Sequence, residues 1–375
     1  MKVLFFITDL GVGGAERQVV DLADRFAGKG AQVKIAYLTG DASVRPSNHD
    51  IELIGFGVDR SLYGLISGYI RLRQLIRRFR PDVVHSHMVH ANLLARVVRI
   101  TTSIPQLIST AHSTNEGGKL RMMAYYVTDF LANTSTNVSE EAVEVFEEKR
   151  AVPRGRMIAV PNGIDTDRFH FNAELRGTTR TAMKLAADEK VILAVGRLVP
   201  AKDYPNLLRA FAQVDRRLRK LALWIVGAGD LLPELERLAD ELEIAGEVKF
   251  LGMRRDVPAL LNAADIYVLS SAWEGLPLVI GESMASEKVV VATDCGGVRE
   301  VLSDCGFLVP SKQPAALAAA LEQALKLSEP ESAQFGARAR ARIVESYSLD
   351  SSVAIWSDVY AGKRVLGSRM SSAQQ

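Results

Sequence analysis

Short apolar runs alternate with longer segments in which apolar residues recur every three or four positions, first over residues 2–111 and again over residues 191–309. A short apolar run is typical of a buried strand, and the helical period predicts an amphipathic helix. Strands that alternate with helices form parallel sheets covered on both faces. The pattern therefore predicts an α/β protein with two Rossmann-like halves.

The predicted elements fall into two groups separated by a polar stretch, which runs from the Pro and Asn-Gly turn near residue 161 to about residue 190. Strands of the first group are predicted at 2–8, 32–38, 51–56, 82–85, 106–111 and 157–160, and helices at 15–27, 62–79, 91–100 and 140–149. Strands of the second are predicted at 191–195, 221–226, 248–251, 265–269, 289–292 and 307–309, with helices at 205–214, 232–242, from 277, from 314 and from 348 to 360. The predicted domains are 1–165 and 175–347, followed by a disordered tail over 366–375.

Composition narrows the class of protein. The 375 residues are 48% hydrophobic and 24% charged with a net charge of +2, which favours a globular protein and gives no overall charge for nucleic acid. Two cysteines are too few for a disulfide framework, so a reducing cytoplasm is expected. No apolar run approaches the roughly 20 residues of a membrane span, and the apolar opening over residues 3–7 is too short for a signal peptide.

A glycine turn follows the first predicted strand, with Gly11, Gly13 and Gly14 before the first helix. A dinucleotide fingerprint would place a third glycine where this chain has Glu16, and a carboxylate there would repel a pyrophosphate. The turn therefore disfavours a nicotinamide enzyme.

Histidines gather where two predicted strands of the first domain end. His85, His87 and His90 could be metal ligands, but no carboxylate accompanies them locally, so a structural or cleft-lining role is the main interpretation. His112 follows the next strand, and an ordinary loop histidine is the alternative there.

Two loops of the second domain carry candidate ligand-binding charges. Glu274 and Glu282 bracket a helix start at Pro277, where free N–H groups attract an anion while a carboxylate accepts hydrogen bonds from hydroxyl groups. Arg197 and Lys202 lie on a strand-to-helix loop and could clamp a diphosphate. A phosphorylated, hydroxyl-rich ligand fits both loops. The alternative is ordinary surface charge.

Together these motifs resemble the retaining family-4 glycosyltransferases of GT-B fold, the glycosyl transferases of group 1. The resemblance covers about residues 1–365 and rests on Gly13-Gly14-Ala15-Glu16, His112, Pro161 to Asp165, Arg197 with Lys202, and Glu274 with Glu282. It implies two Rossmann-like domains that face each other across a cleft, a hinge at the Pro161 to Asp165 stretch, and a C-terminal helix over 348–365 that packs back on the first domain. Asp203 stands where family members usually have glycine, which puts the geometry of that loop in doubt.

The resemblance also implies a reaction and a set of site residues. The enzyme would transfer a hexose or N-acetylhexosamine from a nucleotide-diphosphate sugar, with UDP as the expected nucleotide, with retention and without metal or cofactor. Implied catalytic residues are His112 near the reacting carbon, Arg197 and Lys202 on the diphosphate, and Glu274 on the sugar hydroxyls. Glu282 would hold the ribose, and the remaining implied donor-binding residues are Gly13, Gly14, Gly252, Met253, Gly275, Leu276 and Pro277.

Residues 60–121 are locally basic, with ten Arg or Lys side chains against Asp82 and Glu116 and with interleaved tyrosines. A basic surface with exposed aromatics is attracted to an anionic bilayer, and an ordinary solvated arginine face is the alternative. We call this segment the basic stripe. Its cations are Arg60, Arg71, Arg73, Arg77, Arg78, Arg80, Arg96, Arg99, Lys119 and Arg121, and its tyrosines include Tyr63, Tyr69, Tyr125 and Tyr126.

The stripe favours a peripheral enzyme at the cytoplasmic face of the plasma membrane, acting on a lipid-linked saccharide in the synthesis of a bacterial O-antigen, capsule or exopolysaccharide. Three alternatives stay open: a glycosyltransferase with a soluble small-molecule acceptor, a nucleotide-sugar 2-epimerase of the same fold, and a catalytically silent partner subunit. The sequence leaves open the donor base and sugar, the acceptor and linkage, and the oligomeric state.

Overall fold

The computed structural model describes residues 1–59, 61–114, 116–215 and 220–363, apart from the side chain of Leu62. The chain divides into two compact units, which are described separately below. The first contains residues 1–163 and the chain from Leu349 onward, and the second contains Ile164–Ser348. The tail predicted over 366–375 lies outside the described residues.

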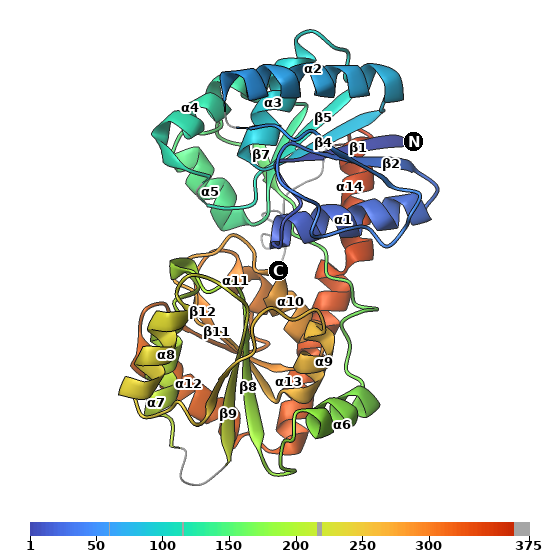
Figure 1. The fold of residues 1–375 in the computed structure, drawn as a ribbon. Helices are drawn as coiled ribbons and strands as arrows, with labels where there is room; N and C mark the ends of the chain where they lie inside the picture. The colour runs from blue at the N-terminus through green and yellow to red at the C-terminus, as the bar shows by residue number, and fades with distance from the viewer. Residues whose placement is uncertain (60, 115, 216–219, 364–375) are drawn as a thin grey trace. The chain divides into compact units, whose positions relative to one another are not determined.

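The first unit is built on a parallel sheet with the strand order β3-β2-β1-β4-β5-β6-β7 (Figure 1). Its described strands are β1 (Lys2–Ile7), β2 (Gln32–Tyr37), β3 (Glu52–Gly55), β4 (Val83–His87), β5 (Gln106–Thr110), β6 (Thr134–Asn137) and β7 (Met157–Ala159). Because every pair is parallel, all seven described strands end at the same edge of the sheet. That edge carries the glycine turn and the histidines.

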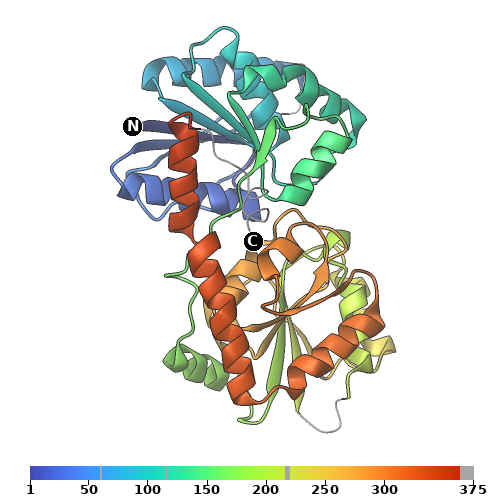
Figure 2. The same cartoon turned by 180° about the vertical axis from the view of Figure 1, so that it is seen from behind.

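Helices cover both faces of this sheet. One face packs against α1 (Gly14–Gly28) and α14 (Leu349–Tyr360), which lie side by side (Figure 2). The other face packs against α2 (Leu62–Phe79), α3 (Val89–Arg99), α4 (Gly118–Thr128) and α5 (Glu140–Glu148), and the 3-10 turn η1 (Asp129–Leu131) follows α4. The last described helix, α14, is therefore part of the first unit's core, with Trp356 and Tyr360 buried in it.

The second unit has a parallel sheet with the order β10-β9-β8-β11-β12-β13. Its described strands are β8 (Lys190–Val195), β9 (Leu221–Val226), β10 (Val248–Phe250), β11 (Ile266–Leu269), β12 (Val289–Asp294) and β13 (Phe307–Pro310). One core cluster joins the sheet to α7 (Tyr204–Gln213), α8 (Leu232–Glu241) and α12 (Pro314–Lys326). The other joins it to α9 (Val257–Ala263), α10 (Leu278–Ala285), α11 (Val298–Leu302) and α13 (Glu329–Arg342). The unit also contains a 3-10 turn, η2 (Pro200–Lys202), and a π-helical turn, η3 (Ile343–Tyr347).

The predicted α/β class with two parallel sheets is confirmed, but strand β6 and the helices α4, α6, α9 and α11 were not predicted. The polar stretch predicted as a plain connection contains α6 (Ala173–Ala182), which buries none of its residues and so has no apolar period. Strand β6 has the sequence Thr-Ser-Thr-Asn, without an apolar run. Helix α4 carries apolar residues on inward and outward faces, which hides the helical period.

Candidate active site

The glycine turn places a buried carboxylate at the start of α1. Gly13 has an extended backbone with φ −168°, and a Cβ there would lie 2.4 Å from Oε2 of Glu16. Glu16 itself is buried, so its carboxylate folds back over Gly13. Gly14 is the first residue of the helix. The carboxylate therefore packs against the backbone of the turn itself.

The histidines at the ends of β4 and β5 form two different arrangements. His85 is fully hydrogen-bonded, with Nδ1 2.7 Å from the Tyr360 hydroxyl and Nε2 2.7 Å from the Thr110 hydroxyl. His87 lies two residues further along the same strand, and its Nδ1 is 2.9 Å from Nε2 of His112. His85 therefore joins the sheet to α14, while His87 joins it to the loop that carries His112.

These three histidines are neutral near pH 7. Burial lowers the pKa of His85 and His87 well below the ordinary value, and it lowers the pKa of His112 to about 4. The third residue of the suspected metal cluster, His90, is exposed on α3. Over the described part of the chain, no group of three or more His, Cys, Asp or Glu side chains is arranged to hold a metal ion.

Glu116, which the sequence did not single out for the site, holds the loop after His112. Its Oε1 accepts a hydrogen bond of 3.0 Å from the backbone N–H of His112, and its Oε2 accepts one of 2.6 Å from the Tyr125 hydroxyl. The same hydroxyl accepts a hydrogen bond of 2.9 Å from Nδ2 of Asn92. Burial raises the pKa of Glu116. The loop is thus tied to α3 and α4 through a chain of hydrogen-bonded polar groups.

In the second unit, two of the predicted donor-binding residues are paired. Lys202, in the turn after β8, donates a hydrogen bond of 2.5 Å from Nζ to Oε1 of Glu274, in the loop after β11. Ser271 donates to the same oxygen at 2.6 Å. The neighbouring Ser270 contacts the lysine, since its hydroxyl donates a hydrogen bond of 2.8 Å to the backbone carbonyl of Lys202. The ends of two adjacent strands are therefore fastened together at this edge of the sheet.

Glycines allow the backbone of this site to pack closely. A Cβ on Gly227 would lie 1.9 Å from the carbonyl oxygen of Gly196, and Gly227 has a positive φ of 146°. A Cβ on Gly296, at φ 57°, would lie 2.4 Å from the carbonyl oxygen of Glu274. The next N–H, that of Gly297, donates to the carbonyl of Gly275 at 2.7 Å. The backbone of the loop after β12 thus packs directly against the backbone of the loop that holds Glu274.

The other predicted donor-binding residues surround this pair along the same sheet edge. Arg197 is exposed on the turn after β8, and Pro277 caps the N-terminus of α10 with no side-chain hydrogen bond to it. Glu282 is half-buried in the second turn of that helix. Gly252 has a positive φ of 64°, and its carbonyl accepts a hydrogen bond of 2.9 Å from Gly227. Beside it, Met253 is 72% exposed, while Gly275 and Leu276 lie between Glu274 and Pro277.

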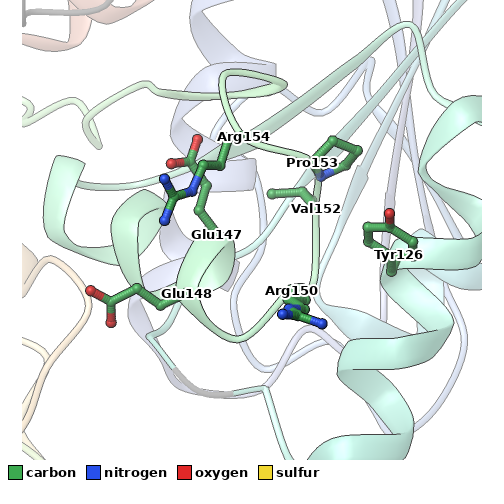
Figure 3. Close-up of a pocket in the computed structure, with 7 residues that line it drawn as sticks. All are labelled: Tyr126, Glu147, Glu148, Arg150, Val152, Pro153 and Arg154. Atoms are coloured by element: carbon green, nitrogen blue, oxygen red, sulfur yellow. The ribbon is translucent and has the colours of Figure 1, made fainter.

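A hollow elsewhere in the first unit does not coincide with this chemistry. It is lined by Tyr126, Glu147, Glu148, Arg150, Val152, Pro153 and Arg154 (Figure 3). These residues belong to the second half of α4, the end of α5 and the connection into β7, at the edge where the strands begin. Ligands of open α/β sheets bind at the opposite edge, beyond the carboxyl ends of the strands. The histidine edge is therefore the better candidate in this unit.

The basic stripe is not one continuous surface, which corrects the sequence interpretation. Arg96 is 0% exposed, and its guanidinium donates hydrogen bonds to Ser135, to Asp129 and to the backbone carbonyl of Tyr125. Tyr125 is buried as well, because it points inward from α4 toward Glu116. Arg60 lies outside the described residues. Arg71, Arg77, Arg78, Arg80, Lys119 and Arg121 are exposed, while Arg73 and Arg99 are half-buried.

The outward side of α4 and η1 is apolar instead. Its exposed residues recur at helical spacing, and we call them the α4 face: Leu120 at 78%, Met123 at 58%, Tyr126 at 50%, Val127 at 57% and Phe130 at 77% exposed. The first half of α2 adds exposed Tyr63, Leu65, Ile66 and Ile70. An apolar side this extensive on a surface helix indicates a contact with a partner or a membrane. No helix in the described residues is long and apolar enough to cross a bilayer.

Family models match both halves of the chain. The model described as Glycosyltransferase Family 4 matches residues 12–168, and the model described as Glycosyl transferases group 1 matches residues 176–342. The first match ends, and the second begins, close to the boundary between the two units at Gly163 and Ile164.

Two named relatives differ in the acceptors that their names give. The chain is 29% identical over 341 residues to an N-acetyl-D-galactosaminyltransferase of Campylobacter jejuni whose name specifies a saccharide linked to PP-undecaprenol, with 87% of this chain and 89% of that protein covered. It is 35% identical over 290 residues to a D-inositol 3-phosphate glycosyltransferase of Geodermatophilus obscurus. That match covers 69% of this chain and 62% of the relative, which is less than two thirds of its length.

A solved structure has the same fold. The Anabaena protein HepE, determined in complex with UDP and glucose, superimposes with a TM-score of 0.86 at 20% sequence identity, over 96% of this chain and 100% of that one. At this identity the likeness concerns the fold, which is that of the GT-B glycosyltransferases.

Proposed function

Because this chain belongs to the glycosyltransferases of GT-B fold, with a family-4 domain followed by a group-1 domain, we propose that it transfers a hexose or N-acetylhexosamine from a UDP-sugar, with retention, to a lipid-linked saccharide. The product would be an intermediate of a bacterial surface polysaccharide. The lipid-linked acceptor is supported by the Campylobacter jejuni relative and by the α4 face, and UDP by the complex of HepE.

The observation that carries the proposal is the contact between Lys202 and Glu274 at the carboxyl edge of the second sheet. We assign Lys202 and exposed Arg197 to the departing diphosphate, together with the start of α10 after Pro277. Glu274, whose Oε1 is already held by two donors, would bind sugar hydroxyls through its remaining lone pairs rather than attack the sugar. Glu282 would bind the ribose, and the backbone at Gly252 and Met253 the base.

The first unit would supply His112 and the acceptor surface. A neutral imidazole, as the lowered pKa of His112 indicates, can donate or accept a hydrogen bond with a sugar hydroxyl without adding charge to the site. Gly13 and Gly14 would leave room for the donor at the adjacent strand end.

Metal independence is part of the proposal. Cations and a helix start would neutralise the charge that develops on the leaving diphosphate, which in other enzymes is a task of Mg²⁺ or Mn²⁺. Activity should survive EDTA. Loss of activity with the chelator and recovery with Mn²⁺ would contradict this assignment and return attention to His85, His87 and His90.

The test is turnover with a panel of nucleotide sugars, with and without undecaprenyl-diphosphate-linked saccharides. We expect slow hydrolysis of one UDP-sugar, faster transfer to a lipid-linked acceptor, and an α-anomeric product from an α-linked donor. Glu274→Ala should abolish donor hydrolysis and sugar transfer. Glu243→Ala, on an exposed turn of the same unit, should leave both activities in place. Absence of turnover with every UDP-sugar would sink the proposal, and a 2-epimer formed without acceptor would establish the epimerase instead.

Attachment to the cytoplasmic face of an anionic membrane is the second part of the proposal. The α4 face is apolar, and Lys119 and Arg121 lie on the same helix. Burial of the apolar side chains in the membrane and attraction of the two cations to anionic lipids would therefore act together. The exposed cations Arg77 and Arg78 on α2 add to the attraction. Each cation near an anionic surface contributes about 1 kcal/mol at low ionic strength. This surface replaces the continuous stripe expected from sequence.

Co-sedimentation with vesicles tests the attachment. Wild-type protein should bind phosphatidylglycerol vesicles and bind less as salt rises, because the Debye length is about 8 Å at physiological ionic strength. Leu120→Glu with Phe130→Glu should abolish binding, and Arg77→Glu with Arg78→Glu should weaken it. Val344→Glu, at an exposed apolar position of the second unit, is the matched control and should bind normally. Equal sedimentation of all four proteins would contradict the proposal.

A soluble acceptor is the second candidate, favoured by the match to the D-inositol 3-phosphate glycosyltransferase. Side-by-side transfer assays separate the two. Faster transfer to a sugar phosphate than to a lipid-linked saccharide, by a protein that ignores vesicles, would establish the soluble acceptor.

A further inference from the structure

The contact between His87 and His112 leaves two ring nitrogens that have no partner among the described residues. Nδ1 of His87 and Nε2 of His112 are 2.9 Å apart, with the ring centroids separated by 5.2 Å. Nε2 of His87 and Nδ1 of His112 are both buried and have no hydrogen-bond partner among the described residues. His87 is 1% exposed, so bulk water does not satisfy its free nitrogen.

The chemistry of a neutral imidazole pair fixes the hydrogen-bonding character of these two nitrogens. Each ring carries one proton, and one of the two protons forms the hydrogen bond between the rings. The ring that donates keeps a bare nitrogen, which is an acceptor. The ring that accepts must carry its own proton on its other nitrogen, which is a donor. The two free nitrogens are therefore always one donor and one acceptor, whichever way the shared proton lies.

We propose that His87 is a positioning residue for the transfer reaction, which sets the ring orientation and tautomer of His112 so that Nδ1 of His112 meets a substrate hydroxyl. The inference rests on the proposed function and extends it to a residue that the motifs did not assign. With Nε2 of His112 occupied by His87, Nδ1 is the nitrogen that remains for a ligand. A sugar hydroxyl can serve either tautomer, because it both donates and accepts.

His85 is the internal comparison that separates this role from a structural one. It lies on the same strand, with its ring centroid 4.0 Å from that of His87, and both of its nitrogens are bonded to hydroxyls of the protein. A histidine that serves only the core can be satisfied in this way. An unpaired buried polar group costs roughly 1–3 kcal/mol, and His87 and His112 each carry one.

The backbone after His87 is also strained. Met88 has φ 70° and ψ 157° at the N-cap of α3, a region that residues other than glycine rarely adopt. Its N–H donates to the carbonyl of Thr110 at 3.1 Å, which holds the strained peptide against β5. Strain of this kind persists where the surrounding structure fixes it, commonly at functional sites. The end of β4 is therefore held in a defined position beside the strand that precedes His112.

Three variants test the proposal in the full-length protein. His87→Phe keeps a ring in the pocket beside Phe5 and removes the nitrogens, His87→Asn restores one polar group close to the position of Nδ1, and His112→Phe removes the positioned ring. We expect His87→Phe to lower kcat for UDP-sugar turnover about 10- to 100-fold, since misplacement by about 1 Å costs that much. UDP affinity and the melting temperature should stay near wild type, and His87→Asn should recover most of the rate.

The double variant decides whether the two residues act as one unit. His87→Phe with His112→Phe should be no slower than His112→Phe alone. Losses that multiply, or full activity of His87→Phe, would overturn the proposal. His85→Phe is the control for a structural histidine and should lower the melting temperature with a smaller effect on kcat.

Nitrogen-15 NMR of histidine-labelled protein gives a readout that does not require turnover. Wild type should show His112 in a single neutral tautomer, and His87→Phe should show exchange between two. If wild-type protein turns over no UDP-sugar, the proposed function fails, while the tautomer measurement still decides whether His87 orients His112. A single unchanged tautomer in His87→Phe would overturn the positioning role.

Discussion

Lys202 and Glu274 are 72 positions apart in sequence, yet Nζ of the lysine lies 2.5 Å from Oε1 of the glutamate. Their side chains are 19% and 14% exposed, so the contact is partly withdrawn from water. In the protein without ligand, each of these charges neutralises the other. A donor whose diphosphate approaches Lys202 would release the carboxylate for the sugar, which couples recognition of the two parts of the donor.

Removing either member of this pair should have opposite effects on nucleotide binding. Lys202→Met should weaken UDP binding about 10- to 100-fold, because a charge-assisted hydrogen bond contributes about 1.5–3 kcal/mol. Glu274→Gln frees the lysine, so UDP affinity should be retained or rise while sugar transfer falls. Isothermal titration with UDP measures both. Equal weakening by the two substitutions would show that the pair acts only to hold the loops together.

Gly296→Ala should destabilise the second unit and the loop that carries Glu274. The added Cβ would lie 2.4 Å from the Glu274 carbonyl oxygen, at a backbone φ of 57°. Strain and overpacking of this kind cost about 1–3 kcal/mol. Gly246→Ala is the matched control, because nothing lies within 4 Å of its Cβ and its φ is not positive. Urea unfolding should place Gly296→Ala well below the control, and coincident curves would contradict the close approach.

Acid should destabilise the first unit through its buried histidines. Burial lowers the pKa of His85, His87 and His112, so the unfolded chain binds protons that the folded protein does not. The stabilisation is therefore complete above the unfolded pKa of about 6.5 and is lost as pH falls toward about 4, by up to about 1.4 kcal/mol per pH unit for each group. Glu116, whose pKa is raised, acts in the opposite direction, because the stability that this one group contributes is present at low pH and is lost as pH rises.

Urea unfolding across this pH range, at fixed salt, measures the slope. His112→Phe should reduce the slope of the unfolding free energy against pH by the contribution of one histidine, because the variant has no group to protonate at that position. His49→Gln, at an exposed position, should leave it unchanged. A wild-type stability that does not fall below about pH 6.5 would mean that these histidines are not held neutral by the fold.

The fold class followed from periodicity because most strands of both sheets are apolar runs buried on two faces. Leu221–Val226 was predicted with its observed bounds, and so was the helix Leu62–Phe79. Strand β6 was missed for the reverse reason, since its buried Ser135 and Thr136 are satisfied by hydrogen bonds rather than by apolar packing. Sequence patterns record hydrophobicity, and they do not record which polar groups will find partners.

The candidate site could be located from sequence only as a set of loops. Parallel strands bring their carboxyl ends to one edge, which was enough to place Lys202 and Glu274 at the same edge of one sheet. Their hydrogen bond, and the one between His87 and His112, depend on register and loop conformation that no local pattern encodes. Glu116 escaped notice because its partner Tyr125 lies on a helix whose apolar residues face both ways.

Arg96 provides the last prediction, because the sequence counted it among surface cations and the structure buries it. Its guanidinium lies 3.5 Å from Oδ1 of Asp129, which also accepts a hydrogen bond of 2.5 Å from the Ser135 hydroxyl. Burial lowers the pKa of Arg96, so the cation depends on this carboxylate and its neighbours. Asp129→Asn leaves a buried charge without compensation and should destabilise the protein by about 3–5 kcal/mol.

Asp358→Asn is the matched control, because its ion pair with Lys363 is exposed and should contribute nothing measurable. The double variant Arg96→Met with Asp129→Leu should recover part of the lost stability, since apolar side chains can replace a buried ion pair. Urea unfolding measures all three variants. If Asp129→Asn and Asp358→Asn unfold at the same urea concentration, Arg96 is not the buried cation described above. Arg96 would then count among the exposed cations of the first unit. A continuous basic surface would then join the α4 face as a candidate contact with the membrane.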